Sequence, residues 1–269
     1  MFRDITLGQY YPGNSPMHRA DPRVKIILTF ILMTTIMIAK SYTAFLMIAG
    51  LILATVIFCR IPFGYTVKGL KPIMPVVVFA ALVNIFTTEG TLLYKFRFIH
   101  ITYEGLDTAA KMSLRIVTLI AGTSIMLLTT TPLSLTDGIE RLLYPLSRIG
   151  LPVHEFAMMM NIALRFIPTL LEETDKVMKA QTSRGVDFET GGIIERGKSF
   201  IPVLVPLFVS ALRRADELAV AMEARCYRGG KGRTRMRQLK LSKADLQITF
   251  FLAAFEFVLL YVQYFKMPV

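Results

Sequence analysis

Residues 105–128, GLDTAAKMSLRIVTLIAGTSIMLL, form a stretch that is long and apolar enough to cross a lipid bilayer as one helix. Further spans are predicted at Val24–Ala39, Ala44–Cys59, Pro72–Phe86 and Leu246–Phe265. The first three spans along the chain are shorter than the roughly 20 residues that a crossing requires, so they must recruit flanking residues or lie where the bilayer is thin. The sequence therefore predicts an all-α, polytopic membrane protein with about five transmembrane helices.

The composition supports this class. Of the 269 residues, 54% are hydrophobic, which is more apolar sequence than a soluble domain of this length can use. The formal net charge is nevertheless +12. An excess of Lys and Arg beside membrane spans is typical of loops that stay in the cytoplasm. The basic run 225–243 is expected to contact anionic lipid headgroups. Binding to nucleic acid would require interleaved aromatic residues, and the run offers only Tyr227.

The positions of the basic residues predict the orientation. The segment between the fourth and fifth spans carries 18 of the 31 Lys and Arg residues, and the N-terminal tail and the second loop carry most of the others. We therefore expect a multi-pass protein of the cell membrane with its N-terminus in the cytoplasm and its C-terminus outside. The predicted division is a tail with four spans (1–128), a cytoplasmic helical coupling domain (129–243) and the last span (244–269).

Within the coupling domain, helices are expected at Leu135–Ile149, Val153–Ser183 and Ile194–Tyr227. The last two contain the same pattern: each has a Phe-Ile-Pro segment and later a triplet in which small residues flank an arginine. The triplets are Ser183-Arg184-Gly185 and Ala224-Arg225-Cys226.

An arginine between small residues at a helix C-terminus can project without steric cover. Its planar guanidinium is suited to binding a partner's carboxylates or carbonyls in a bidentate manner. The simpler alternative is that each arginine caps the last carbonyls of its own helix. The repetition of the triplet favours docking to a partner.

The triplets, together with the five spans, resemble the transmembrane T component (EcfT) of energy-coupling factor (ECF) transporters. The N-terminal string GQYYPGNSPMHRADPRVK, from Gly8 to Lys25, is similar to the amino-terminal signature of that family. The resemblance extends over essentially the whole chain. The triplets depart slightly from the Ala-Arg-Gly that the family favours, but both central arginines are present.

The resemblance implies a non-enzymatic coupling subunit of an ABC-type importer for vitamins or other micronutrients. Its partners would be two ABC-type ATPases, which bind the ATP and Mg, and a small substrate-binding S component in the membrane. Arg184 and Arg225, flanked by Ser183, Gly185, Ala224 and Cys226, would dock into the ATPases. The implied surface for the S component consists of Met158, Met159, Met160, Phe200, Pro202, Val203, Pro206 and Phe208.

Two other function classes fit the sequence less well. A self-contained secondary transporter or channel is disfavoured because the spans show no paired inverted repeat and few charges. A nucleotide-binding enzyme is suggested only by Gly192–Ser199, which matches the phosphate-loop pattern G-x-x-x-x-G-K-[ST]. That motif requires a preceding buried strand, and the residues before it are polar. No metal site is expected, because His18, His100 and His154 lack ligand spacing.

Two charged residues lie at matching depths within the predicted membrane. Arg115 in the fourth span and Glu256 in the fifth are each roughly 15 Å from the outer surface at about 1.5 Å per residue, which predicts an intramembrane ion pair. The alternative is that Glu256 is protonated or faces a partner subunit. Lys111 is a second candidate partner and could also pair with Asp107 at the i, i+4 spacing.

Overall fold

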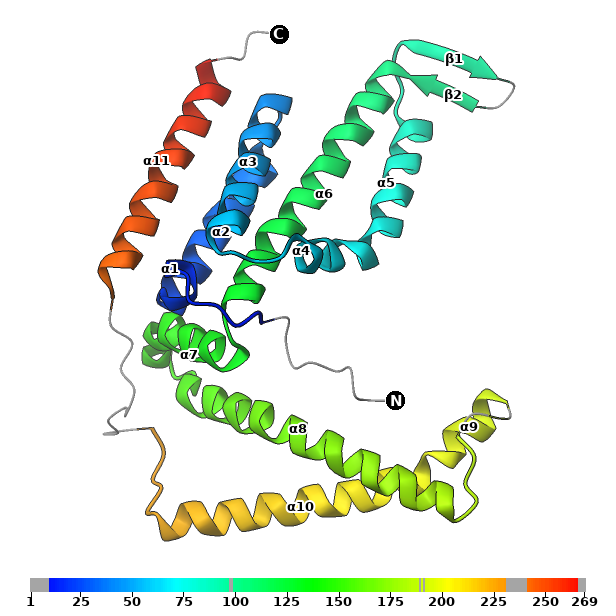
Figure 1. Ribbon diagram of the computed structural model, residues 1–269, viewed down its shortest axis with the longest axis vertical. Coiled ribbons are helices and arrows are strands. Elements are labelled where there is room, and N and C mark those ends of the chain that lie inside the picture. Colours follow the sequence, from blue (N-terminus) through cyan, green and yellow to red (C-terminus); the bar gives the residue numbers. More distant parts are fainter. Residues whose placement is uncertain (1–9, 97–98, 189, 191, 231–240, 266–269) are drawn as a thin grey trace. The chain divides into compact units, whose positions relative to one another are not determined.

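The computed structural model describes residues 10–96, 99–188, 190, 192–230 and 241–265. The chain divides into two compact units, which are described separately (Figure 1). The bundle unit contains residues 8–141 and 238–269, and the crossed-helix unit contains residues 142–237. Residues 231–240 of the basic run lie outside the described residues, as do Gly8 and Gln9 of the N-terminal signature.

The bundle unit has a helix at each of the five predicted spans, which confirms the all-α class. These helices are α2 (Pro22–Ile38), α3 (Tyr42–Phe58), α5 (Met74–Thr87), α6 (Tyr103–Thr129) and α11 (Lys243–Phe265). Shorter elements connect or precede them, namely α1 (Pro16–Arg19), α4 (Phe63–Leu70), η1 (Lys71–Ile73) and α7 (Pro132–Leu143). An antiparallel hairpin of β1 (Leu92–Phe96) and β2 (Ile99–Thr102) joins α5 to α6.

Helix length separates these spans into two groups. Three continuous helical segments are long and apolar enough to cross a membrane, namely 63–87, 103–129 and 244–264. The helices α2 and α3 have 17 residues each, which corresponds to about 26 Å at 1.5 Å per residue. They are therefore shorter than the roughly 30 Å hydrocarbon core, as the sequence predicts.

Helix α6 is central to the bundle, where it contacts α2, α3, α4 and α5 (Figure 1). The core lies mainly between α2, α3 and α6, and α11 adds Leu259 to it. Gly105 allows α6 to approach α5 closely, because a Cβ at this position would lie 3.2 Å from the Ile85 carbonyl oxygen. A methyl group at position 105 would therefore require the neighbouring α5 backbone to move by a few tenths of an ångström.

The predicted ion pair between Arg115 and Glu256 is wrong. Arg115 Nη2 donates a 2.8 Å hydrogen bond to the carbonyl of Ala39, and the carboxylate of Glu256 accepts a 2.6 Å bond from Thr35 Oγ1. Gln263 Nε2 donates to the adjacent carbonyl of Ile38 at 2.9 Å. Arg115 and Gln263 therefore satisfy carbonyls at the end of α2 that have no partner within the helix. The predicted i, i+4 pairing of Lys111 with Asp107 is confirmed, because the two side chains form an ion pair at 2.6 Å.

The N-terminal signature closes one end of the same bundle. The backbone N–H of Tyr11 donates to the Leu128 carbonyl at 2.9 Å, and Lys25 Nζ donates to the Thr129 carbonyl at 2.9 Å. Both carbonyls belong to the last turn of α6. Asp245, at the start of α11, accepts from the Asp21 N–H at 2.7 Å. The signature therefore caps α6 and ties the first residues of α2 to α11.

The imidazole of His18 lies between this segment's polar groups. Its Nε2 donates to the Tyr11 carbonyl at 3.0 Å, and its Nδ1 lies 2.7 Å from Ser15 Oγ. Burial lowers the pKa of His18; the bond to Tyr11 opposes this shift, and the charge of Lys25 adds to it. The imidazole is therefore held in its neutral form at neutral pH.

The crossed-helix unit contains α8 (Val153–Ser183), α9 (Ile193–Ser199) and α10 (Ile201–Ala224), preceded by η2 (Tyr144–Ile149). Helix α8 has the predicted bounds. The single helix predicted at 194–227 is wrong, because Phe200 ends α9 and is also the N-cap of α10. Pro202 explains the break, since it lacks an N–H and is favoured in the first turn of a new helix.

A double-mutant cycle tests whether Glu256 bonds to Thr35 or pairs with Arg115. Thr35→Val and Glu256→Leu, made singly and together, should show a coupling of about 0.5–3 kcal/mol in the free energy of unfolding, because each change removes the hydrogen bond that the two residues share. Unfolding in detergent micelles provides the measurement. The control cycle of Arg115→Gln with Glu256→Gln should be additive to within about 0.5 kcal/mol. Strong coupling in the control cycle, with additivity in the first, would restore the rejected ion pair.

Candidate functional site

The two long helices of the crossed-helix unit run in opposite directions where they contact each other (Figure 1). Glu173 of α8 accepts hydrogen bonds from two residues of α10, from Ser210 Oγ at 2.5 Å and from Arg214 Nη2 at 2.6 Å. Gln181 Nε2, near the C-terminus of α8, donates to the Pro202 carbonyl at the start of α10. The C-terminus of α8 therefore lies beside the N-terminus of α10, and the two triplets lie at opposite ends of this unit.

The first triplet forms the C-terminal cap of α8. Gly185 has a left-handed backbone with φ of +89°, and its N–H donates to the Thr182 carbonyl at 2.9 Å. The N–H of Val186 reaches back to the Gln181 carbonyl at 3.1 Å. These two bonds define a Schellman motif, in which backbone N–H groups satisfy the last carbonyls of a helix.

The second triplet has the same geometry at the end of α10. Cys226 takes the left-handed conformation with φ of +55°, and its N–H donates to the Glu223 carbonyl at 2.8 Å. The N–H of Tyr227 donates to the Met222 carbonyl at 3.0 Å. The repetition found in the sequence is therefore also a repetition of hydrogen bonds.

These caps bear on the simpler alternative for the arginines. Because backbone N–H groups already occupy the carbonyls at both helix ends, neither guanidinium is required for capping. Arg184 and Arg225 are both exposed, as are the small residues on each side of them. Within the described part of the chain, no hydrogen bond or ion pair holds either guanidinium. The geometry leaves both side chains able to bind a group on another molecule.

The surface predicted for the S component is only partly exposed. Met159, Met160 and Phe208 are 57%, 41% and 66% exposed, but Val203 is 2% exposed, so its assignment to an outer surface is wrong. The reason is helical periodicity: Val203 lies on the face of α10 that also carries Ser210 and Arg214, and this face contacts α8.

The opposite face of α10 carries a continuous row of apolar side chains at helical spacing. Each is at least half exposed, and together they form the α10 apolar stripe: Ile201, Leu204, Val205, Phe208, Val209 and Leu212. Sequence periodicity alone could have identified this row, because its members recur every three or four residues. An exposed apolar row of this kind is typical of a contact with lipid or another protein.

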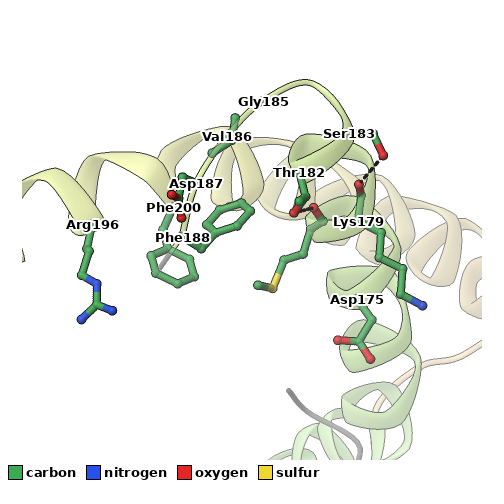
Figure 2. Close-up of a pocket in the computed structure, with 11 residues that line it drawn as sticks. Asp175, Lys179, Thr182, Ser183, Gly185, Val186, Asp187, Phe188, Arg196 and Phe200 are labelled. Atoms are coloured by element: carbon green, nitrogen blue, oxygen red, sulfur yellow. Dashed lines mark hydrogen bonds between the residues drawn. The ribbon is translucent and has the colours of Figure 1, made fainter. Parts of the chain in front are cut away.

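An open cleft of about 1050 Å³ adjoins the first triplet (Figure 2). Ser183 and Gly185 of the triplet border it, and the aromatic rings of Phe188 and Phe200 lie 5.4 Å apart within it. Charged side chains lie at either side, with Asp175 and Lys179 on α8 and Arg196 on α9. Sequence analysis did not predict this cleft, because it depends on the path of residues 186–188.

The phosphate-loop match has a different structure from such a loop. Residues Ile193–Ser199 form helix α9, and Glu195 accepts a hydrogen bond from the Gly192 N–H at 3.1 Å as part of an N-terminal cap. In a phosphate-binding loop, the N–H groups of these residues surround the anion before the helix begins. Here the same residues are already helical, so the match is one of sequence alone.

Comparison with known proteins gives a consistent picture. Residues 13–236 match the CbiQ family, which is described as cobalt transport protein. The chain is 59% identical to the energy-coupling factor transporter transmembrane protein EcfT of Ruminiclostridium cellulolyticum over 249 residues, which are 93% of each protein. It is 47% identical to the protein of the same description from Bacillus subtilis, over 92% of this chain and 94% of that protein.

The two helix caps should respond differently when the left-handed residue of each is replaced by alanine. Gly185→Ala places a Cβ in the left-handed conformation and should destabilise the end of α8 by about 1–2 kcal/mol. Cys226→Ala is the matched control and should have little effect, because Cys226 already carries a Cβ. Hydrogen exchange at the Val186 and Tyr227 amides measures each cap directly. The left-handed conformation assigned to Gly185 would be contradicted if Gly185→Ala accelerated exchange at Val186 no more than Cys226→Ala accelerated it at Tyr227.

Proposed function

This chain belongs to the CbiQ family of transport proteins, and we propose that it is the membrane-embedded coupling subunit of an ECF-type importer. In this role it transmits ATP hydrolysis in two partner ATPases to a substrate-binding S component. The observation that carries the proposal is the pair of matched helix caps, each of which leaves an arginine exposed. Two equivalent groups at opposite ends of one unit are suited to two similar partners.

The docking chemistry follows from the guanidinium group. Arg184 and Arg225 each offer a planar set of donors that can bind a carboxylate, or backbone carbonyls, in a groove of an ATPase. The small neighbours Ser183, Gly185, Ala224 and Cys226 let a partner surface approach the guanidinium closely. In this proposal ATP and Mg are bound by the ATPases, and this chain needs no cofactor of its own.

The S component is proposed to contact the exposed apolar side chains of the crossed-helix unit. These are the α10 apolar stripe and, on α8, Met159 and Met160. Methionine side chains are flexible and adapt to differently shaped partners, which suits a subunit that meets a moving or exchangeable protein. Val203 is excluded from this surface by its burial.

The orientation that the basic residues predict is retained in this proposal. The N-terminus and the crossed-helix unit lie in the cytoplasm, where the ATPases are, and the C-terminus lies outside. The protein is then a multi-pass component of the cell membrane.

The alternative of a self-contained transporter receives little support from the charges in the bundle. Arg115 and Lys25 donate to carbonyls at the ends of α2 and α6, and Lys111 pairs with Asp107. Glu256 accepts a hydrogen bond from Thr35. A substrate or ion pathway is usually lined by charged groups that serve the transported species. In the described spans, Arg115, Lys25 and Glu256 instead bond to a second helix, and the Lys111–Asp107 pair lies within α6.

The proposal predicts a loss of docking when the arginines are removed. Arg184→Ala and Arg225→Ala should each weaken association with the ATPases, and the double variant should lack ATP-driven uptake, because losing a buried charge-assisted contact costs about 2–5 kcal/mol. Co-purification and uptake in reconstituted liposomes provide the measurements.

Arg165→Ala and Arg213→Ala are the matched controls, because both residues are exposed on the same two helices and away from the triplets. They should retain both ATPases and full uptake. Full uptake by the Arg184→Ala/Arg225→Ala variant would rule out the docking role.

A further inference from the structure

The two triplets have the same caps but different surroundings. After the first triplet, residues 186–188 border the open cleft described above, together with α8 and α9. After the second triplet, the chain packs closely onto the first turn of α8, where a Cβ on Gly230 would lie 2.6 Å from the His154 ring. The sequence repeat therefore ends at the triplets, and the segments that follow them give the two ends different shapes.

The cleft combines an apolar interior with charged edges. Met178, Val186, Phe188 and Phe200 supply the apolar part, and the two phenylalanine rings pack against each other at an angle of 45°. Figure 2 shows both rings between Arg196 on one side and Asp175 and Lys179 on the other. Such a site is suited to an apolar side chain carried by a polar segment.

The cleft is continuous with the first docking triplet, because Ser183 and Gly185 belong to both. A protein surface that binds the Arg184 guanidinium can therefore extend over the cleft as well. Arg184 requires a carboxylate or carbonyl from that surface, and the cleft next to it can bury an apolar side chain of the same surface.

We propose that the cleft receives an apolar side chain from the ATPase that docks at Arg184, next to the group that the arginine binds. The inference rests on the proposed function and extends it. Among the described residues, the chain after the second triplet packs closely on α8 at Gly230, whereas the first triplet borders a cleft. The two ends therefore differ in shape, and the α8 end selects the ATPase that carries this side chain. The residues that determine the selection are Phe188 and Phe200, together with the path of residues 186–188.

Filling the cleft tests this inference without altering the arginine. Thr182 borders the cleft, is exposed, and donates its only side-chain hydrogen bond to the Met178 carbonyl of its own helix. Thr182→Trp should therefore preserve α8 while occupying the space. The full chain in lipid nanodiscs is titrated with each ATPase singly, and the ATPase that loses affinity on Arg184→Ala is assigned to the α8 end.

The inference predicts that Thr182→Trp weakens binding of that ATPase at least tenfold and leaves binding of the other within about twofold. The matched control is Glu223→Trp, which adds the same bulk two residues before Arg225 and should change neither affinity by more than about twofold. Equal losses from the two tryptophans would mean that bulk near a triplet is sufficient, and would overturn the inference.

The outcomes separate the two proposals. If Arg184→Ala weakens binding but Thr182→Trp does not, the cleft has no role and the docking function stands. If Arg184→Ala affects neither ATPase, both proposals fail. If Thr182→Trp abolishes binding of both ATPases, the crossed-helix unit is perturbed, and Phe188→Ala decides: a tenfold loss for the α8-end ATPase alone supports the inference, and unchanged affinity overturns it.

Discussion

Carbonyl groups in the last turn of a helix have no partner within that helix, and inside a membrane no water reaches them. This chain satisfies them in two ways. In the bundle unit, donors from other segments bond to these carbonyls. The side chains of Arg115 and Gln263 do so at the end of α2, and the Lys25 side chain and the Tyr11 backbone N–H do so at the end of α6. In the crossed-helix unit, the backbone of each triplet closes its own helix. The cations Arg115 and Lys25 are therefore bound internally at helix ends of the bundle unit, whereas the triplet arginines Arg184 and Arg225 are left exposed.

This difference connects the fold to the proposed function. An arginine that capped its own helix would be unavailable to a partner, whereas the Schellman motifs at Arg184 and Arg225 leave both guanidinium groups exposed. The antiparallel contact of α8 and α10, held by Glu173 with Ser210 and Arg214, then sets the two arginines at opposite ends of the unit. A displacement of either end by a docked ATPase can be carried along a packed helix to the α10 apolar stripe.

Many helices of the fold and both triplets are predictable from the sequence, because periodicity and the positions of small residues are sufficient signals. The five spans, the bounds of α8 and both triplets were found in this way. The Arg115–Glu256 pair was wrong because equal depth in the membrane does not fix which way a side chain points around its helix. Periodicity does not place the break at Phe200, because apolar residues continue through Pro202 into α10. Burial of Val203 and the cleft at Phe188 depend on tertiary contacts that a single sequence does not display.

Site-specific photo-cross-linking tests most directly whether each triplet lies against an ATPase in the assembled complex, as we propose. A photoreactive residue at position 183 or at position 224, in the complete membrane complex, should capture an ATPase in each case. A chain that carries both should yield a product containing two ATPases, which intact-mass measurement identifies. Capture of no ATPase from either position, with efficient capture from exposed positions elsewhere on α8 and α10, would contradict the account.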